Sequence, residues 1–190
     1  MYRAFAWKAL REKIDLEDES RLGDLARSAT IEFEDYGDRE RILIDGIDVS
    51  GEITTPEITE ASSVVSTCGE VRRALVSLQR QMARDGGVVA EGRDTGTVVF
   101  PDADLKIYLD ASSDSRSCRR HDEDVARGIP TTLEETRSNI LERDKRDSTR
   151  ITSPLVRARD AVYLDSSALS ISEVIEQAMK LVDSRLTRND

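Results

Sequence analysis

The chain changes its hydrophobic pattern at about residue 29. Before that point apolar side chains recur every three or four positions, which predicts two short helices; these positions are Tyr2, Phe5, Ala6, Leu10, Ile14, Leu22, Leu25 and Ala26. From about residue 29 to 53 apolar and charged residues alternate instead, and Gly37 and Gly46 stand where turns are needed. This alternation predicts a small antiparallel hairpin or meander.

The rest of the chain alternates short apolar runs with helical patterns. A helix is predicted through residues 71–82. Four more are predicted after residues whose side-chain oxygens can cap a first turn: Thr55, Ser112 or Ser113, Thr132 and Ser170. Strands are predicted at residues 88–90, 105–109 and 161–164. Short strands between helices predict an α/β fold, with a parallel sheet flanked by helices. The last helix should carry one apolar face, formed by Ile171, Val174, Ile175, Ala178, Val182 and Leu186.

Length and charge narrow the function classes. A chain of 190 residues suits one domain with a small insertion. The net charge of −10 argues against a general binder of nucleic acid or of anionic membranes. The sequence shows neither an apolar run of roughly 18 residues nor a signal-peptide pattern, and Cys68 and Cys118 lack the spacing of a metal or redox pair. We therefore expect a cytoplasmic protein with free thiols.

One loop carries the clearest chemical signal. Directly after the apolar residues 88–90, two glycines surround Arg93 and Asp94 in the stretch Glu91-Gly92-Arg93-Asp94-Thr95-Gly96-Thr97-Val98-Val99-Phe100-Pro101. A strand that ends in such a loop can offer a guanidinium fork and an acceptor to a small ligand at the carboxyl edge of a sheet. Taken alone, Asp94 could equally be a turn carboxylate.

Arginine is concentrated further along the chain, where residues 116–150 hold nine basic and eight acidic side chains. Arg116, Arg119 and Arg120 share one face of a predicted helix, and so do Arg143, Asp147 and Arg150. A flexible hinge at residues 127–130 separates the two faces. Without further information, residues 142–147 would be an ordinary salt-bridged helix surface.

Two motifs together resemble those of bacterial cytidylate kinases. The first is EGRDxGTVVFPDA, followed by a strand, DAS and the arginine cluster; the second is ERDxRD, followed three residues later by arginine. The resemblance extends from Met1 to about Arg185. It implies the fold of a P-loop nucleoside monophosphate kinase that transfers the γ-phosphoryl group of ATP, with Mg²⁺, to CMP or dCMP. It also implies a monomer whose partners are small nucleotides, with no nucleic acid or membrane.

The resemblance assigns roles to individual residues. Arg3, Arg93 and Arg150 would contact the acceptor phosphate. Ser63, Arg72 and Asp94 would contact the cytosine base, and Arg143 and Asp147 would contact the ribose. Arg116, Arg119 and Arg120 would contact the ATP phosphates. The catalytic cations would be Arg93, Arg119 and Arg150. Residues 29–85 would form the monophosphate-binding insertion and residues 113–150 the lid. The resemblance does not assign metal ligands, although Glu91 could lie near a metal-bound water.

The chain departs from the family's pattern at its start. These kinases open with a strand, a glycine-rich phosphate loop and a helix, but no GxxxxGK[ST] pattern occurs in the 190 residues, and Met1-Tyr2-Arg3 resembles the end of a later segment. We expect a chain that begins about one strand-helix-strand unit late, through an internal start or as a fragment, with negligible kinase activity alone. The alternatives are a non-catalytic nucleotide-binding or scaffolding homologue, and a kinase for another acceptor such as UMP or shikimate.

Overall fold

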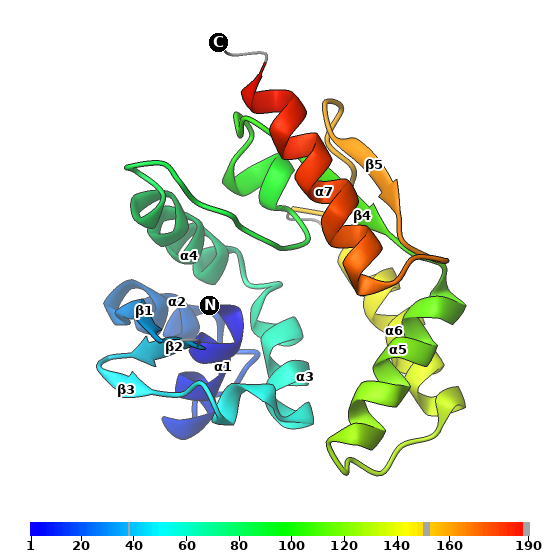
Figure 1. The fold of residues 1–190 in the computed structure, drawn as a ribbon. Helices are drawn as coiled ribbons and strands as arrows, with labels where there is room; N and C mark the ends of the chain where they lie inside the picture. Colours follow the sequence, from blue (N-terminus) through cyan, green and yellow to red (C-terminus); the bar gives the residue numbers. More distant parts are fainter. Residues whose placement is uncertain (38, 150–152, 188–190) are drawn as a thin grey trace. The chain divides into compact units, whose positions relative to one another are not determined.

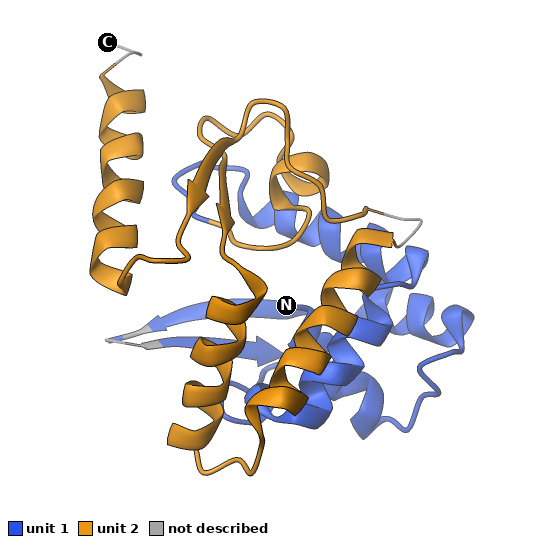
Figure 2. Ribbon diagram, turned by 90° about the vertical axis from the view of Figure 1, so that its right-hand side faces the viewer, with its two compact units in different colours: residues 1–89 blue, residues 90–190 orange. Residues whose placement is uncertain are grey.

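The computed structural model describes residues 1–37, 39–149 and 153–187. It divides into two compact units, Met1–Val89 and Ala90–Asp190, which Figure 2 shows in different colours. The single domain 1–190, the insertion 29–85 and the lid 113–150 stay predictions.

The first unit combines helices with a small antiparallel sheet (Figure 1). Its elements are α1 (Tyr2–Arg11), α2 (Glu19–Ser28), β1 (Ile31–Tyr36), β2 (Arg39–Ile44), β3 (Ile47–Asp48), a short turn η1 (Glu52–Thr54), α3 (Pro56–Val65) and α4 (Gly69–Met82). The strands pair in the order β1-β2-β3, and both pairings are antiparallel. The two N-terminal helices and the antiparallel meander predicted from the sequence are thus confirmed.

Local signals start the helices of this unit where the sequence predicts them. Thr55 accepts a hydrogen bond from the Ile58 amide and caps α3, and Pro56 takes the first helical position, where a missing amide hydrogen costs nothing. A core then fixes how the elements pack, and its largest fully buried side chains are Phe5, Leu22, Ile31, Ile44, Val49, Val65, Val71 and Leu75. These residues come from α1, α2, the sheet, α3 and α4, so the unit has a hydrophobic core of its own.

The second unit contains the parallel sheet. Strand β4 (Ile107–Asp110) pairs in parallel with β5 (Val162–Asp165), in a register that sets Asp110 opposite Asp165. The carboxyl ends of both strands therefore meet at one edge. The helices of this unit are α5 (Ser113–Ala126), α6 (Leu133–Thr149) and α7 (Ile171–Leu186), and a π-helical turn, η2 (Thr95–Val99), follows the Gly92 loop. The α/β fold with a parallel sheet, flanking helices and a small antiparallel sheet is confirmed.

The predicted caps of the second unit are also present. Ser112 caps α5, the Thr132 hydroxyl accepts from the Glu135 amide at the start of α6, and Ser170 with Glu173 forms a complete capping box at α7. Between α5 and α6, Gly128 adopts a φ of +71°, which glycine reaches without steric cost. The two helices pack against each other as an antiparallel hairpin.

Two expectations differ from the structure. The buried strand predicted at residues 88–90 is wrong: these residues form no strand, they are exposed, and Val89 is 102% exposed. A strand is stable only when a neighbour satisfies its backbone groups, and β4 pairs with β5 instead. The apolar face of α7 exists in the sequence pattern but is not buried, since Ile171, Ile175 and Leu186 are exposed.

The part of the chain that the structure describes contains both cysteines. Cys68 and Cys118 are both free thiols, the first buried and the second exposed. The described helices include none with the length and apolar character that a membrane crossing requires.

Candidate functional site

The loop after residue 90 is tightly wound around the carbonyl group of Asp94. The amide of Val98 donates to this oxygen at 2.8 Å, and the amide of Phe100 donates to the Thr95 oxygen at 2.8 Å, which closes the π-helical turn. A Cβ atom at Gly92 would lie 2.5 Å from the Thr95 Oγ1 atom, so a larger residue there would force the Thr95 side chain to shift. Single π-helical turns occur often at functional sites. The loop thus presents Arg93 and Asp94 on a defined backbone.

Arg93 lies against two carboxylates of α6. Its Nε atom is 3.1 Å from the Asp147 Oδ2 atom, and its NH1 atom is 3.9 Å from the Asp144 Oδ1 atom. The Asp147 side chain is only 6% exposed, and Asp94 beside Arg93 is also buried. Burial makes a carboxylate costly unless a cation or donor faces it. Arg143 lies 3.8 Å from the same Asp147 oxygen, so two of the predicted guanidinium groups meet one buried acid.

The three arginines of α5 have different partners. Arg116 donates from Nε to the Ala111 oxygen at 3.0 Å and from NH1 to the Asp144 Oδ2 atom at 2.6 Å. Arg119 reaches across to the loop between β5 and α7, where it donates to the oxygens of Ser166 and Leu169. Arg120 pairs with Glu123 and Asp124 of its own helix. The predicted basic face is therefore connected to α6, to the loop after β5 and to acidic residues of α5 itself.

The carboxyl edge of the parallel sheet is a hydrogen-bonded platform. Tyr163 donates its hydroxyl to the Asp110 Oδ2 atom at 3.0 Å, which raises the pKa of Tyr163. At the end of β5, Ser167 donates its hydroxyl and its amide to Asp165 and so lowers the pKa of that carboxyl group. The Ser167 hydroxyl also accepts from the Ser112 amide at the start of α5. Open parallel sheets bind ligands at this edge.

The first unit holds Arg3, Ser63 and Arg72, which come from α1, α3 and α4. Arg72 is buried; its NH1 atom donates to the Ser66 oxygen at 3.0 Å, and its guanidinium lies 5.5 Å from the ring centre of Tyr2. Ser66 in turn donates its hydroxyl to the Ser63 oxygen. These contacts connect Arg72 with the end of α3 where Ser63 is buried. Arg3 donates weakly to the Ile53 oxygen, at 3.5 Å.

Comparison with known proteins identifies the family. A family model described as "Cytidylate kinase" matches residues 1–184. The cytidylate kinase of Geobacter sp. (strain M21) is 46% identical over 190 residues, which are 100% of this chain and 82% of that protein. The cytidylate kinase of Geobacillus sp. (strain WCH70) is 41% identical over 186 residues, covering 98% and 83%. That of Bacillus cereus (strain G9842) is 42% identical over 182 residues, covering 96% and 81%.

The chain belongs to the cytidylate kinase family. It is a nucleoside monophosphate kinase, a phosphotransferase that acts on CMP or dCMP with ATP as the phosphate donor, and this confirms the activity expected from its two motifs. The roles of individual residues are a separate question. In the second unit, Arg93 and Asp94 lie in the Gly92 loop, and Arg143 and Asp147 lie on α6, where Asp147 pairs with both arginines. Arg150 lies outside the described residues.

Sequence reasoning missed one carboxylate of this cluster of charged side chains. Asp144 is the carboxylate that contacts both Arg93 and Arg116, although in the sequence it is one charge among six in residues 142–147. A signal was available: Asp144 stands three positions before Asp147, so both lie on one helix face. The pattern could not show that the partners of this face come from a loop and another helix.

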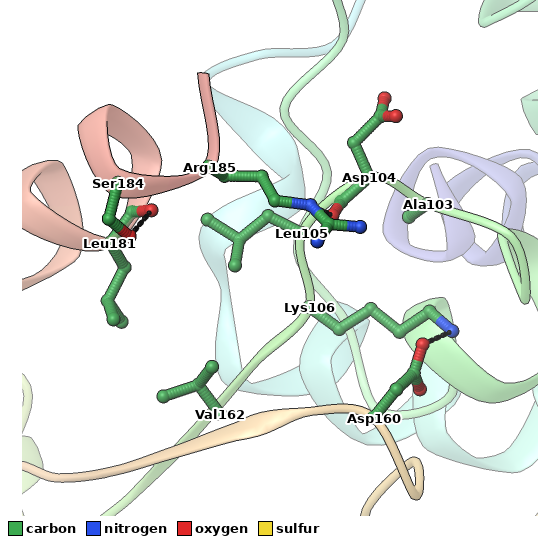
Figure 3. Close-up of a pocket in the computed structure, with 9 residues that line it drawn as sticks. All are labelled: Ala103, Asp104, Leu105, Lys106, Asp160, Val162, Leu181, Ser184 and Arg185. Atoms are coloured by element: carbon green, nitrogen blue, oxygen red, sulfur yellow. Dashed lines mark hydrogen bonds and ion pairs between the residues drawn. The ribbon is translucent and has the colours of Figure 1, made fainter. Parts of the chain in front are cut away.

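A cavity of about 270 Å³ lies elsewhere in the second unit (Figure 3). Its lining comes from the segments before β4 and β5 and from the end of α7: Ala103, Asp104, Leu105, Lys106, Asp160, Val162, Leu181, Ser184 and Arg185. Lys106 pairs with Asp160 at 2.7 Å and lowers the pKa of that carboxyl group. The cavity lies at the amino-terminal ends of β4 and β5, whereas the hydrogen-bonded platform lies at their carboxyl ends. None of the predicted site residues lines it.

We expect Gly92→Ala to weaken CMP binding and to lower stability by about 1–3 kcal/mol, the usual cost of overpacking, because the new Cβ would meet the Thr95 Oγ1 atom. Adding Thr95→Ala removes that atom and should restore most of both losses. Calorimetric titration with CMP and thermal unfolding measure the two effects. Gly51→Ala is the matched control, since its φ is −76° and a Cβ there has open space. A loss that persists in the double variant would contradict the clash.

Proposed function

We propose that the Gly92 loop and α6 form the phosphate and sugar side of the CMP site. Arg93 would contact the acceptor phosphate together with Arg3 and Arg150, and Arg143 and Asp147 would contact the ribose. One observation carries the proposal: the Arg93 guanidinium is oriented by the buried Asp147 carboxylate directly beside the buried Asp94. A guanidinium fork oriented in this way suits a phosphate group, because it can donate two parallel hydrogen bonds.

The base would be read by Asp94, Ser63 and Arg72. Cytosine presents an amino donor beside two acceptors, so a carboxylate together with a hydroxyl and a guanidinium matches its edge, whereas uracil would set an oxygen against Asp94. Asp94 is buried in the second unit, and Ser63 and Arg72 are buried in the first. This supports the assignment, since a buried polar group discriminates strongly between a donor and an acceptor.

The hairpin of α5 and α6 would be the lid, residues 113–150, and residues 29–85 the monophosphate-binding insertion. Arg116, Arg119 and Arg120 would lie near the ATP phosphates, with Arg93, Arg119 and Arg150 as the catalytic cations that balance the charge of the transferred group. The hydrogen bonds from Arg119 to the loop after β5 support a role at the base of the lid. Phosphoryl transfer then needs in-line placement and exclusion of water, which a closing lid provides.

Mg²⁺ would accompany ATP. It usually keeps several waters and binds phosphate oxygens with one or two carboxylates, so it does not need a cage of protein ligands. The described residues contain no group of three or more His, Cys, Asp or Glu side chains that could hold a metal. We further propose a cytoplasmic monomer that binds no nucleic acid, in keeping with its nucleotide substrates and a net charge of −10.

Calorimetric titration with CMP and UMP tests the proposed site. The unaltered protein should bind CMP more tightly, and Asp94→Ala should weaken CMP by roughly 1–3 kcal/mol, the cost of leaving a buried polar group without its partner, while UMP changes little. Asp102→Ala is the control, because Asp102 is an exposed carboxylate shortly after the same loop. Equal affinities of the unaltered protein for CMP and UMP would remove the base-reading role of Asp94.

A further inference from the structure

Asp144 of the second unit contacts two arginines that come from different elements. Its Oδ2 atom accepts from Arg116 NH1 at 2.6 Å, a short charge-assisted hydrogen bond, and its Oδ1 atom lies 3.9 Å from Arg93 NH1. Arg116 belongs to α5, Asp144 to α6, and Arg93 to the loop before the sheet. A single carboxylate therefore stands between two guanidinium groups from separate elements. Its side chain is 24% exposed, so water screens these interactions only in part.

We infer that Asp144, which Arg116 holds from α5, is a positioning residue that orients Arg93 for the phosphate of the acceptor nucleotide. A free arginine side chain loses roughly 2 kcal/mol of rotamer entropy when it is ordered. Asp144 reduces this loss at binding, because Arg93 already lies between Asp147 at its Nε atom and Asp144 at its NH1 atom. The inference rests on the proposed contact between Arg93 and the CMP phosphate.

A second effect of Asp144 acts in the opposite direction. Its negative charge repels the phosphate dianion, so removing it would tighten binding if orientation did not matter. The geometry favours orientation as the larger effect. Both Asp144 oxygens face guanidinium groups, which compensate the charge, and the 2.6 Å bond to Arg116 attaches α6 to α5 next to the Gly92 loop. The sign of the change in affinity therefore separates the two effects.

The test compares CMP with cytidine, which lacks the phosphate. We expect Asp144→Ala and Asp144→Asn to weaken CMP by roughly five- to thirtyfold, the coupling typical of side chains in one ion-pair network, and to leave cytidine within about twofold. A purely structural role would weaken both ligands alike. In the Arg93→Lys background, Asp144→Ala should add little further loss for CMP, because the two residues act through one contact. Calorimetry measures all of these affinities.

Controls separate this inference from the proposed function. Glu142→Gln on the same helix should change neither ligand, since Glu142 is exposed and pairs only with Arg146 among the described residues. The Arg137–Asp114 ion pair still joins α5 and α6 in the Asp144 variants, and Asp144→Asn keeps an acceptor if the alanine variant unfolds. CMP binding that is unchanged or tighter, or an equal loss for cytidine, would overturn the inference. If Arg93→Lys itself left CMP affinity unchanged, the proposed phosphate contact would fail instead.

Discussion

Replacing Arg93 by lysine is expected to weaken CMP binding by roughly 10- to 100-fold, because hydrogen bonds to a charged group contribute about 1.5–3 kcal/mol and lysine cannot reproduce the two parallel bonds of a guanidinium. Lysine keeps the positive charge that faces the buried Asp147. The midpoint of thermal unfolding should therefore fall by only a few degrees, as for a change of about 1 kcal/mol or less.

Calorimetric titration with CMP and with cytidine measures this prediction. Cytidine should bind the lysine variant almost as well as the unaltered protein, because the lost interaction involves the phosphate. Arg127→Lys is the matched control, since Arg127 pairs with the exposed Glu123 four positions earlier. If the Arg93 variant kept full affinity for CMP, or unfolded many degrees earlier, Arg93 would have a structural role in the loop, and the assignment of Asp94 beside it would weaken as well.

Phe5→Ala is expected to lower the free energy of unfolding of the first unit by about 3–5 kcal/mol, the range measured when a buried phenylalanine is truncated. Phe5 is 0% exposed and lies in a core to which α1, α2, α3, α4 and the antiparallel sheet all contribute. The loss combines transfer of the ring from the core with the cavity that it leaves. An effect of this size is a large part of the stability of a small domain.

Urea unfolding followed by the fluorescence of Trp7 reports on this change, because Trp7 is a buried residue of the same helix and is the only tryptophan in the chain. Phe33→Ala serves as the control: Phe33 lies on β1 and is 39% exposed, so its truncation should cost far less. Similar losses for the two variants would contradict the core described for the first unit.

The sequence by itself determined those features that depend on neighbours a few residues apart. The caps at Thr55, Ser112, Thr132 and Ser170 are correct because a cap bonds to an amide two or three positions ahead. The antiparallel meander is correct because the alternation sets Ile31 and Phe33 on one face of β1, where they stand opposite Ile44 and Ile42 of β2. The glycine pattern around Arg93 also marked a tightly wound loop, in which a Cβ atom at Gly92 would clash with the Thr95 side chain.

Only the tertiary structure decided which distant groups meet. Arg116 and Asp144 are separated by 28 positions and Arg119 and Ser166 by 47, so no local pattern could show that the basic face of α5 divides between α6 and the loop after β5. The apolar residues 88–90 failed to form a strand for the same reason, since a strand needs a partner that its own sequence does not specify. Local order follows from propensity and capping over single turns, whereas ion pairs and strand pairing depend on how the whole chain folds back on itself.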